Sequence, residues 1–139
     1  MTDLFVDKVT IYISVPATAI KPRTFERRII NHCQVQGGFV EKAEGTIRNV
    51  VNAQTVITRD VANYVKPYVF ESTPQDMRQD LYTAQVGDFV VFGEVDDVVQ
   101  NAEDFAKLQQ KYKENGFKVS FANAAINGMS IDNITITNA

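Results

Sequence analysis

Apolar and polar residues alternate over several short stretches of the chain, a pattern typical of β-strands. The clearest stretch is VTIYISV (9–15), whose apolar residues recur at every second position and predict a half-buried strand. Similar β-prone stretches occupy residues 24–35, 53–60 and 117–121. A Gly-Gly pair at 37–38 is expected to end the stretch at 24–35. The pattern therefore predicts short strands separated by turns.

Two glycine-containing segments are expected to form turns between strands. FVEKAEGTIRNV (39–50) is interpreted as a short strand followed by a polar turn around Gly45. Asn127–Gly128 is a strong signal for a tight β-hairpin. Beyond it, the apolar phase switches across Asp132–Asn133, which predicts a β-bulge.

Other segments depart from simple alternation. FVVF (89–92) is apolar at every position, which predicts a strand covered on both faces or closed into a barrel. YVKPYVF (64–70) is expected to be extended, and Pro67 places it at a sheet edge because proline has no N–H to donate. Polar, proline-containing segments at 16–23 and 71–80 are expected to be exposed loops.

One helix is expected near residues 102–115. Asn101 precedes it as an N-cap, with acidic residues in the first turn, and Gly116 is expected to supply a left-handed stop. Its apolar stripe is narrow and contains Phe105, Leu108 and Tyr112. The helix should therefore pack on the body through one face.

These elements predict a mainly β fold of six to eight short strands, arranged as a small β-barrel or sandwich with the helix near 102–115 on its flank. The length of 139 residues suits a single domain over residues 1–139. The loops near 16–23 and 71–80 would project from that barrel-like body.

Composition narrows the functional classes. The chain carries 14 lysines and arginines against 17 aspartates and glutamates, mixed along its length, whereas a dedicated DNA-binding protein usually shows a basic stripe. The basic segment KPRTFERR (21–28) is interpreted as a solvated loop that leads into a strand. One cysteine permits no internal disulfide, and no stretch has the pattern of a signal peptide or a membrane span. We therefore expect a soluble protein made in the cytoplasm.

No pattern in the sequence marks an active site. Glu94 follows Gly93 where a phosphate-binding loop would need a lysine. His32 and Cys33 are neighbours on an expected strand, so their side chains point to opposite faces and form no nucleophile–base pair. One histidine and one cysteine cannot supply the four ligands that zinc requires. We therefore predict no catalytic residue, no metal site and no cofactor, and we interpret Cys33 as a buried small hydrophobe.

Several segments in order resemble a known family. They are VTIYIS, INHCQVQGGFVEKAEGTIRNVVNAQTVITRD, and YVKPYVF followed by LYTAQVGDFVVFGEVDD, the helix and the final strands. This order resembles small phage and prophage proteins encoded among the head–tail joining genes of tailed phages, namely head-completion or stopper-like proteins. The resemblance extends from about Lys8 to the end of the chain.

The resemblance implies a virion structural protein of the head–tail connector, with no enzymatic activity. Copies would form a ring, with six as the expected number, between a portal or adaptor protein and a tail-side protein. The ring would retain packaged DNA, with non-specific DNA contacts in its lumen, and would dock the tail. The expected partner or lumen contacts lie in the two loops and at the proline edge: Lys21, Arg23, Pro67, Glu71, Gln75, Asp76 and Arg78.

Three alternatives remain open at this point. A tail terminator or tail-tube subunit also fits a small barrel with one flanking helix. An oligonucleotide-binding barrel would need a basic, aromatic groove, against which the net acidity argues. A small hydrolase or isomerase would need a buried pair of carboxylates in a deep pocket.

Overall fold

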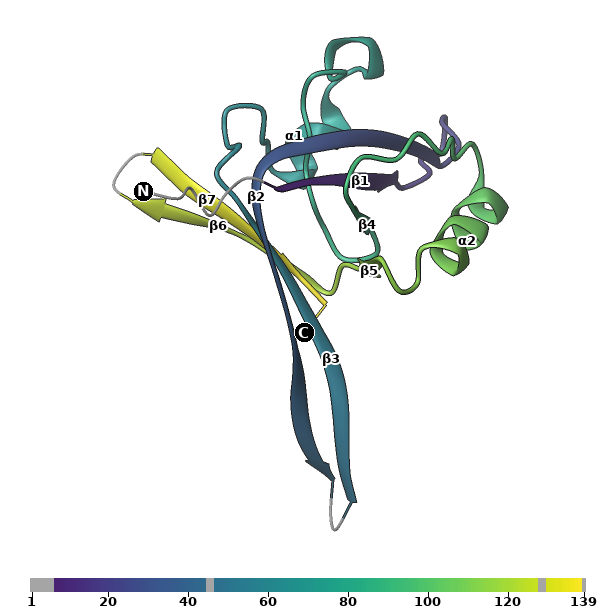
Figure 1. Cartoon of the computed structure of the whole chain (residues 1–139). Helices are drawn as coiled ribbons and strands as arrows, with labels where there is room; N and C mark the ends of the chain where they lie inside the picture. Colours follow the sequence, from purple (N-terminus) through teal and green to yellow (C-terminus); the bar gives the residue numbers. More distant parts are fainter. Residues whose placement is uncertain (1–6, 45–46, 128–129, 139) are drawn as a thin grey trace.

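The computed structural model describes residues 7–44, 47–127 and 130–138, and they form one antiparallel sheet with two α-helices (Figure 1). The seven strands follow the order β5-β4-β1-β2-β3-β7-β6. The elements in chain order are β1 (Asp7–Val15), β2 (Thr24–Glu44), β3 (Ile47–Thr58), α1 (Pro67–Ser72), the 3-10 turn η1 (Gln75–Met77), β4 (Phe89–Phe92), α2 (Ala102–Lys111), β5 (Gly116–Lys118), β6 (Phe121–Asn127) and β7 (Ser130–Thr137). The predicted mainly β class with a flanking helix is confirmed, and the strands form a single open sheet.

The central strand β1 is covered on both faces. Val9, Ile11 and Ile13 belong to one apolar cluster, which also contains Phe70 of α1. Tyr12, on the other face, packs in a second cluster with residues of α2. Residues 9–14 are therefore all buried, and the prediction of a half-buried strand is wrong because α2 covers the second face.

The strand β4 is also covered on both faces, as its unbroken apolar pattern predicts. Val90 packs in the first cluster, whereas Phe89 and Val91 pack in the second. Gly93 follows the strand with a φ of 85°, a left-handed conformation that glycine adopts without strain.

Helix α2 begins where its sequence predicts. The Asn101 side chain accepts a hydrogen bond from the Asp104 N–H at 2.8 Å, and the Asp104 carboxylate accepts one from the Gln100 N–H at 3.1 Å. The Asn101 cap satisfies an N–H group that the first turn leaves unpaired, and the Asp104 carboxylate holds the residue before the cap. The helix ends at Lys111, before the expected 115.

Gly116 does not serve as the left-handed stop of α2. It begins β5 instead, and a Cβ built on it would collide with the carbonyl oxygen of Val90. The position therefore needs glycine because β5 approaches β4 closely.

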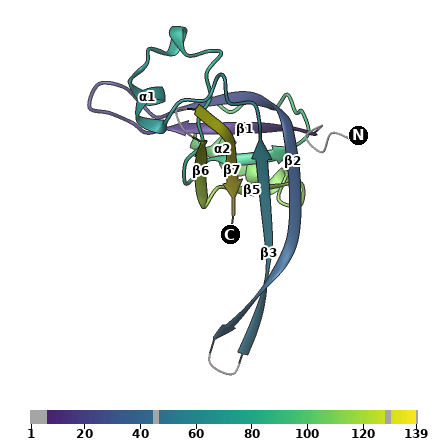
Figure 2. The ribbon, with the colours of Figure 1, turned by 90° about the vertical axis from the view of Figure 1, so that its left-hand side faces the viewer.

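Strands β2 and β3 extend far beyond the rest of the sheet. Gly37 and Gly38 do not end β2; they pair with Gln54 and Ala53, and the pairing continues to Glu44. We call residues 38–44 and 47–53 the β2–β3 arm, which projects away from the body in both views (Figures 1 and 2). Seven residues of strand span roughly 20–25 Å at about 3.3 Å each. The turn predicted around Gly45 lies outside the described residues.

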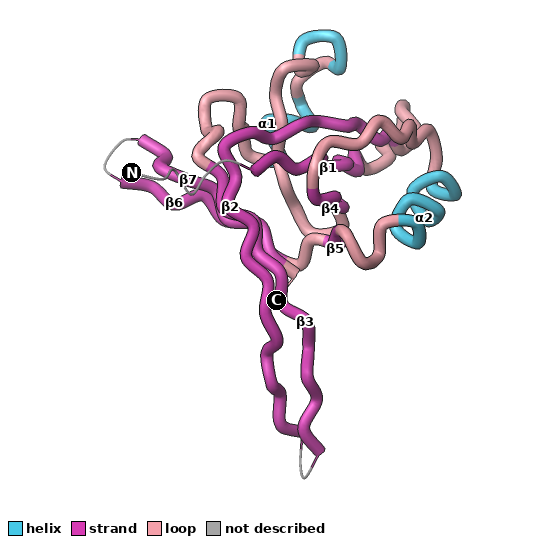
Figure 3. The backbone as a smooth tube through the Cα atoms, viewed as in Figure 1, coloured by secondary structure: helices cyan, strands magenta, loops and turns pink. Residues whose placement is uncertain are grey.

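A bulge marks the point where β2 bends from β1 toward β3. Val9 pairs with Ile30 but Asp7 pairs with Cys33, so β2 has one extra residue at this step. His32 lies there with a φ of 53°, which is uncommon for a residue other than glycine. The bend directs the second half of β2 away from the body, as the tube in Figure 3 shows.

The last two strands pair as an antiparallel hairpin. Ala125 pairs with Asn133 and Ile126 with Ile131, so Asp132 is the extra residue of a bulge, as predicted. The Asn127–Gly128 turn extends outside the described residues.

Candidate functional site

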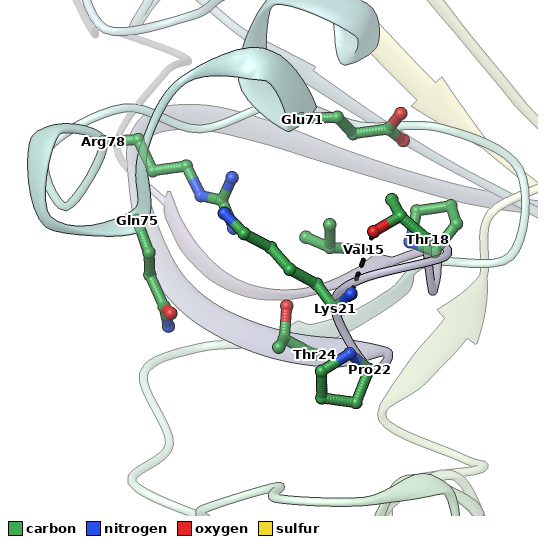
Figure 4. A pocket seen from close by; sticks show the side chains of 9 residues that line it. Val15, Thr18, Lys21, Pro22, Thr24, Glu71, Gln75 and Arg78 are labelled. Atoms are coloured by element: carbon green, nitrogen blue, oxygen red, sulfur yellow. Dashed lines mark hydrogen bonds between the residues drawn. The ribbon is translucent and has the colours of Figure 1, made fainter.

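The two loops expected to be exposed come together at one pocket. Loop 16–23 forms one side of it, and α1 with the following turn η1 forms the other (Figure 4). The cavity has a volume of about 130 Å³. Its lining consists of Val15, Pro16, Thr18, Lys21, Pro22, Thr24, Glu71, Gln75 and Arg78. Four polar residues predicted as contacts, Lys21, Glu71, Gln75 and Arg78, therefore line one cavity.

A buried ion-pair cluster forms the inner wall of this pocket. Both Nε and Nη2 of Arg78 donate to the Oε2 atom of Glu26. The other oxygen, Oε1, accepts from Nη2 of Arg28 at 2.8 Å. Glu26 and Arg78 are each nearly inaccessible to solvent. One carboxylate thus faces two guanidinium groups, which leaves an excess positive charge beside the pocket.

Arg78 also fixes the segment that forms the pocket wall. Its Nη1 donates to the carbonyl oxygens of Phe70 and Thr73 at 3.0 and 2.8 Å. These carbonyls lie at the end of α1, where backbone N–H donors become scarce, and the Phe70 oxygen also accepts from the Thr73 N–H at 3.3 Å. The guanidinium also lies over the Phe70 ring, 4.8 Å from its centroid. Arg78 is therefore buried, unlike the rest of the loop expected to be exposed, although it still lines the cavity.

Pro67 has a different role from the predicted one. It is the first residue of α1, where its fixed φ and missing N–H suit a helix start. The segment 64–70 is thus not an edge strand; its only strand-like contact among the described residues is an isolated bridge from Tyr64 to Tyr82. Phe70 is the buried anchor of the helix.

The remaining predicted contact residues lie near the pocket but outside it. Asp76 is exposed on η1. Arg23 is exposed and donates from Nε to the Ser14 hydroxyl at 2.8 Å. It lines a second, neighbouring hollow with Gln85 and Val86. The structure therefore places both residues at the same end of the body without bringing them into the cavity.

Asp88 is a buried carboxyl group that sequence reasoning missed. Its two oxygens accept from the backbone N–H groups of Ser14 and Gln85, each at 3.0 Å, so it joins the ends of β1 and the turn before β4. Burial raises the pKa of Asp88 to about 7, the two N–H donors lower it, and the charge of Glu71 raises it further. Glu71 is connected to this turn, since its Oε1 accepts from Nε2 of Gln85 at 3.1 Å.

The only histidine and the only cysteine do not form a reactive pair. His32 is exposed at the bulge, whereas Cys33 is fully buried. Burial raises the pKa of the Cys33 thiol to about 11, which keeps it protonated at neutral pH. The interpretation of Cys33 as a buried small hydrophobe is confirmed by its position in the first cluster.

The described residues contain no group of three or more histidine, cysteine, aspartate or glutamate side chains arranged to hold a metal ion. Within residues 7–44, 47–127 and 130–138, neither helix has the length and apolar character needed to cross a bilayer.

The fold and pocket define a small mainly β protein with a projecting two-stranded arm. The chain belongs to DUF6751, a family of unknown function, whose match extends over residues 4–138. No curated protein and no solved structure matches the chain.

Proposed function

We propose that this protein is a non-enzymatic structural subunit that assembles into a ring in the head–tail connector of a tailed phage. The observation that carries the proposal is the β2–β3 arm, which extends beyond every other strand of the sheet (Figures 1 and 2). The resemblance of the segment order to head-completion proteins supplies the biological setting. The chain would act by fitting against other subunits.

The arm is suited to contact with another chain. β2 pairs with β1 only as far as Cys33, and β3 pairs with β7 only from Thr55, so the arm strands pair with each other alone among the described strands. Their outer edges therefore present backbone N–H and C=O groups with no strand partner. A two-stranded ribbon is marginally stable in water on its own. A neighbouring subunit that covers an edge of the arm would stabilise it and define its direction.

A ring follows from such an arm by symmetry. An arm that docks on the body of the next copy makes a heterologous contact, and repetition of this contact closes a ring when the rotation permits. In the proposed neck the ring, with six as the expected number of copies, would lie between a portal-side protein and a tail-side protein. Loops around 16–23 and 71–80 would meet those partners or the DNA in the lumen, and the protein would reside in the virion.

Two observations test the proposal. Native mass spectrometry and negative-stain microscopy of the purified full chain at high micromolar concentration should detect a closed ring. A chain that remains monomeric under these conditions would contradict the proposal. Genes for portal and capsid proteins on one side and tail proteins on the other would support the connector assignment. Neighbours that encode unrelated metabolic enzymes would overturn it.

A further inference from the structure

We propose that the pocket between loop 16–23 and α1 receives the Glu94 carboxylate of a second copy of this chain. The inference rests on the proposed ring and identifies one of its contacts, separate from the arm. The pocket lies on the face of the sheet that carries α1, beside the first apolar cluster. Glu94 lies in the segment that crosses the face covered by α2.

Two basic side chains at the pocket keep N–H donors that have no acidic partner among the described residues. The ammonium group of Lys21 has no ion-pair partner among the described residues, and its side chain extends toward Arg78 across the cavity (Figure 4). A guanidinium has five N–H donors, of which four from Arg78 have acceptors in Glu26, Phe70 and Thr73. One N–H from Nη2 therefore remains without an acceptor in the described part of the chain. A carboxylate between Lys21 and Arg78 would satisfy both cations.

The other charges around the pocket do not cancel this preference for a negative group. Glu26 is shared between Arg78 and Arg28, so this cluster alone has one surplus positive charge. Glu71, on the opposite wall, keeps its negative charge and accepts a hydrogen bond from the neutral Gln85 amide at 3.1 Å. Arg28, Arg78 and Lys21 thus stand against Glu26 and Glu71, and the exposed Arg23 and Asp76 nearby add one charge of each sign.

The rim of the pocket and its volume indicate a peptide side chain as the occupant. Ile20 and Met77 directly precede two lining residues, Lys21 and Arg78, and are 89 % and 72 % exposed. Exposed apolar side chains beside a charged cavity are typical of a protein contact. A volume of about 130 Å³ admits a carboxylate with its methylene stem.

The chain itself carries a segment with the matching pattern. Exposure alternates over residues 94–98, with Glu94, Asp96 and Val98 exposed and the two residues between them partly buried. Arg27 fixes this segment by donating from Nε to the Val95 carbonyl oxygen at 2.5 Å. Val98 is 74 % exposed and would pack against the apolar rim while Glu94 enters the pocket. Glu94 has no ion-pair partner among the described residues, whereas Asp96 already contacts Arg27.

The position of the two features requires a second molecule. The pocket and the acidic segment lie on opposite faces of the sheet, so one copy does not fill its own pocket. Each copy would instead offer Glu94 to one neighbour and its pocket to the other. This is a heterologous contact of the kind a ring requires.

A charge exchange tests the inference in the full-length chain. We expect Lys21→Glu and Glu94→Lys each to raise the dissociation constant of self-association about tenfold or more, because each places like charges together. The double variant, which restores an opposite-charge pair, should return to within about threefold of the parent. Lys113→Glu makes the same charge change at an exposed lysine outside the pocket and should leave the constant near that of the parent. Sedimentation velocity measures the dissociation constant of self-association for the parent and the four variants. Circular dichroism tests whether each variant is folded.

The outcomes separate this contact from the ring as a whole. Rescue by the double variant supports the inference. Equal association of parent and both single variants, while removal of the arm abolishes assembly, would overturn the pocket contact and leave the proposed function standing. Loss in Lys21→Glu without rescue by Glu94→Lys would exclude Glu94 as the occupant and overturn the inference. A monomeric parent would contradict both proposals.

Discussion

Glu26 and Arg78 lie 52 positions apart in the chain and form a buried ion pair beside the pocket. The pair joins the beginning of β2 to the segment after α1. Arg28 contacts the same carboxylate, and both guanidinium groups also bind backbone carbonyls. The cluster therefore holds the pocket wall against the sheet.

Replacement of Glu26 by glutamine should destabilise the protein by about 3–5 kcal/mol. The ion pair itself contributes little relative to an apolar core, because desolvation of the charges offsets their attraction. Removal of one partner is different, since it leaves two buried guanidinium groups without a counter-charge. Urea unfolding measures the loss, with Asp76→Asn on the exposed face of η1 as the control. Equal midpoints for the parent and Glu26→Gln would show that the cluster is not buried as described.

Asp88 should make stability depend on pH. Burial raises its pKa from 3.8 to about 7, so between these values the folded protein holds a proton that the unfolded chain releases. The free energy of unfolding contributed by Asp88 is therefore fully present below pH 4 and decreases as pH rises through 7, by up to about 4 kcal/mol. Asp88→Asn cannot titrate and should lack this decrease. Urea unfolding of the parent and of Asp88→Asn at pH values from 4 to 8 measures this difference. The same dependence of the free energy of unfolding on pH in both proteins would contradict the prediction.

Gly116→Ala should separate β5 from β4. The added methyl group would collide with the carbonyl oxygen of Val90, and relief of such overpacking costs about 1–3 kcal/mol. Exchange of the Phe92 N–H, which donates to the Asn115 carbonyl at 2.8 Å, should accelerate. Lys118→Ala, an exposed change on the same strand, should alter stability by less than about 0.5 kcal/mol. An alanine variant as stable as this control would mean that the strands can move apart freely.

Loop 16–23 should be mobile in the free subunit and ordered in the assembly. Only two hydrogen bonds within this loop involve its backbone N–H groups, from Thr18 to the Lys21 carbonyl and from Lys21 to the Thr18 hydroxyl. Residues 71–80 should behave similarly except near Arg78, whose buried contacts hold the chain. Hydrogen exchange of the monomer and the ring tests this, and equally strong protection of the loops in both would disagree with it.

The sequence predicts those elements whose signals are local. Strand β4 has an unbroken apolar run, and α2 has both an N-cap at Asn101 and a helical apolar stripe. Helix α1 escaped prediction because it has six residues and its apolar positions resemble a strand. The length of β2 was also missed. A Gly-Gly pair usually ends a strand, whereas here Gly37 and Gly38 continue the pairing with β3.

The candidate site shows the same division between local and distant signals. Exposure of loops 16–23 and 71–80 follows from their polar, proline-containing sequences, and their residues Lys21, Glu71 and Gln75 meet at the pocket. The burial of Arg78 depends on Glu26, a residue on a distant strand. Charge alone cannot distinguish such a partner from any other acidic residue in the chain.

Excision of the arm tests the central claim most directly. Residues 39–52 would be replaced by Asn-Gly, which forms a two-residue turn between the paired positions Gly38 and Ala53. The body should remain folded, with an unchanged circular dichroism melting transition, because the described side chains of both apolar clusters come from the body. Native mass spectrometry should then detect only monomer, whereas the parent should assemble into a ring. A folded, arm-less chain that still assembles into the parent's ring would contradict the account.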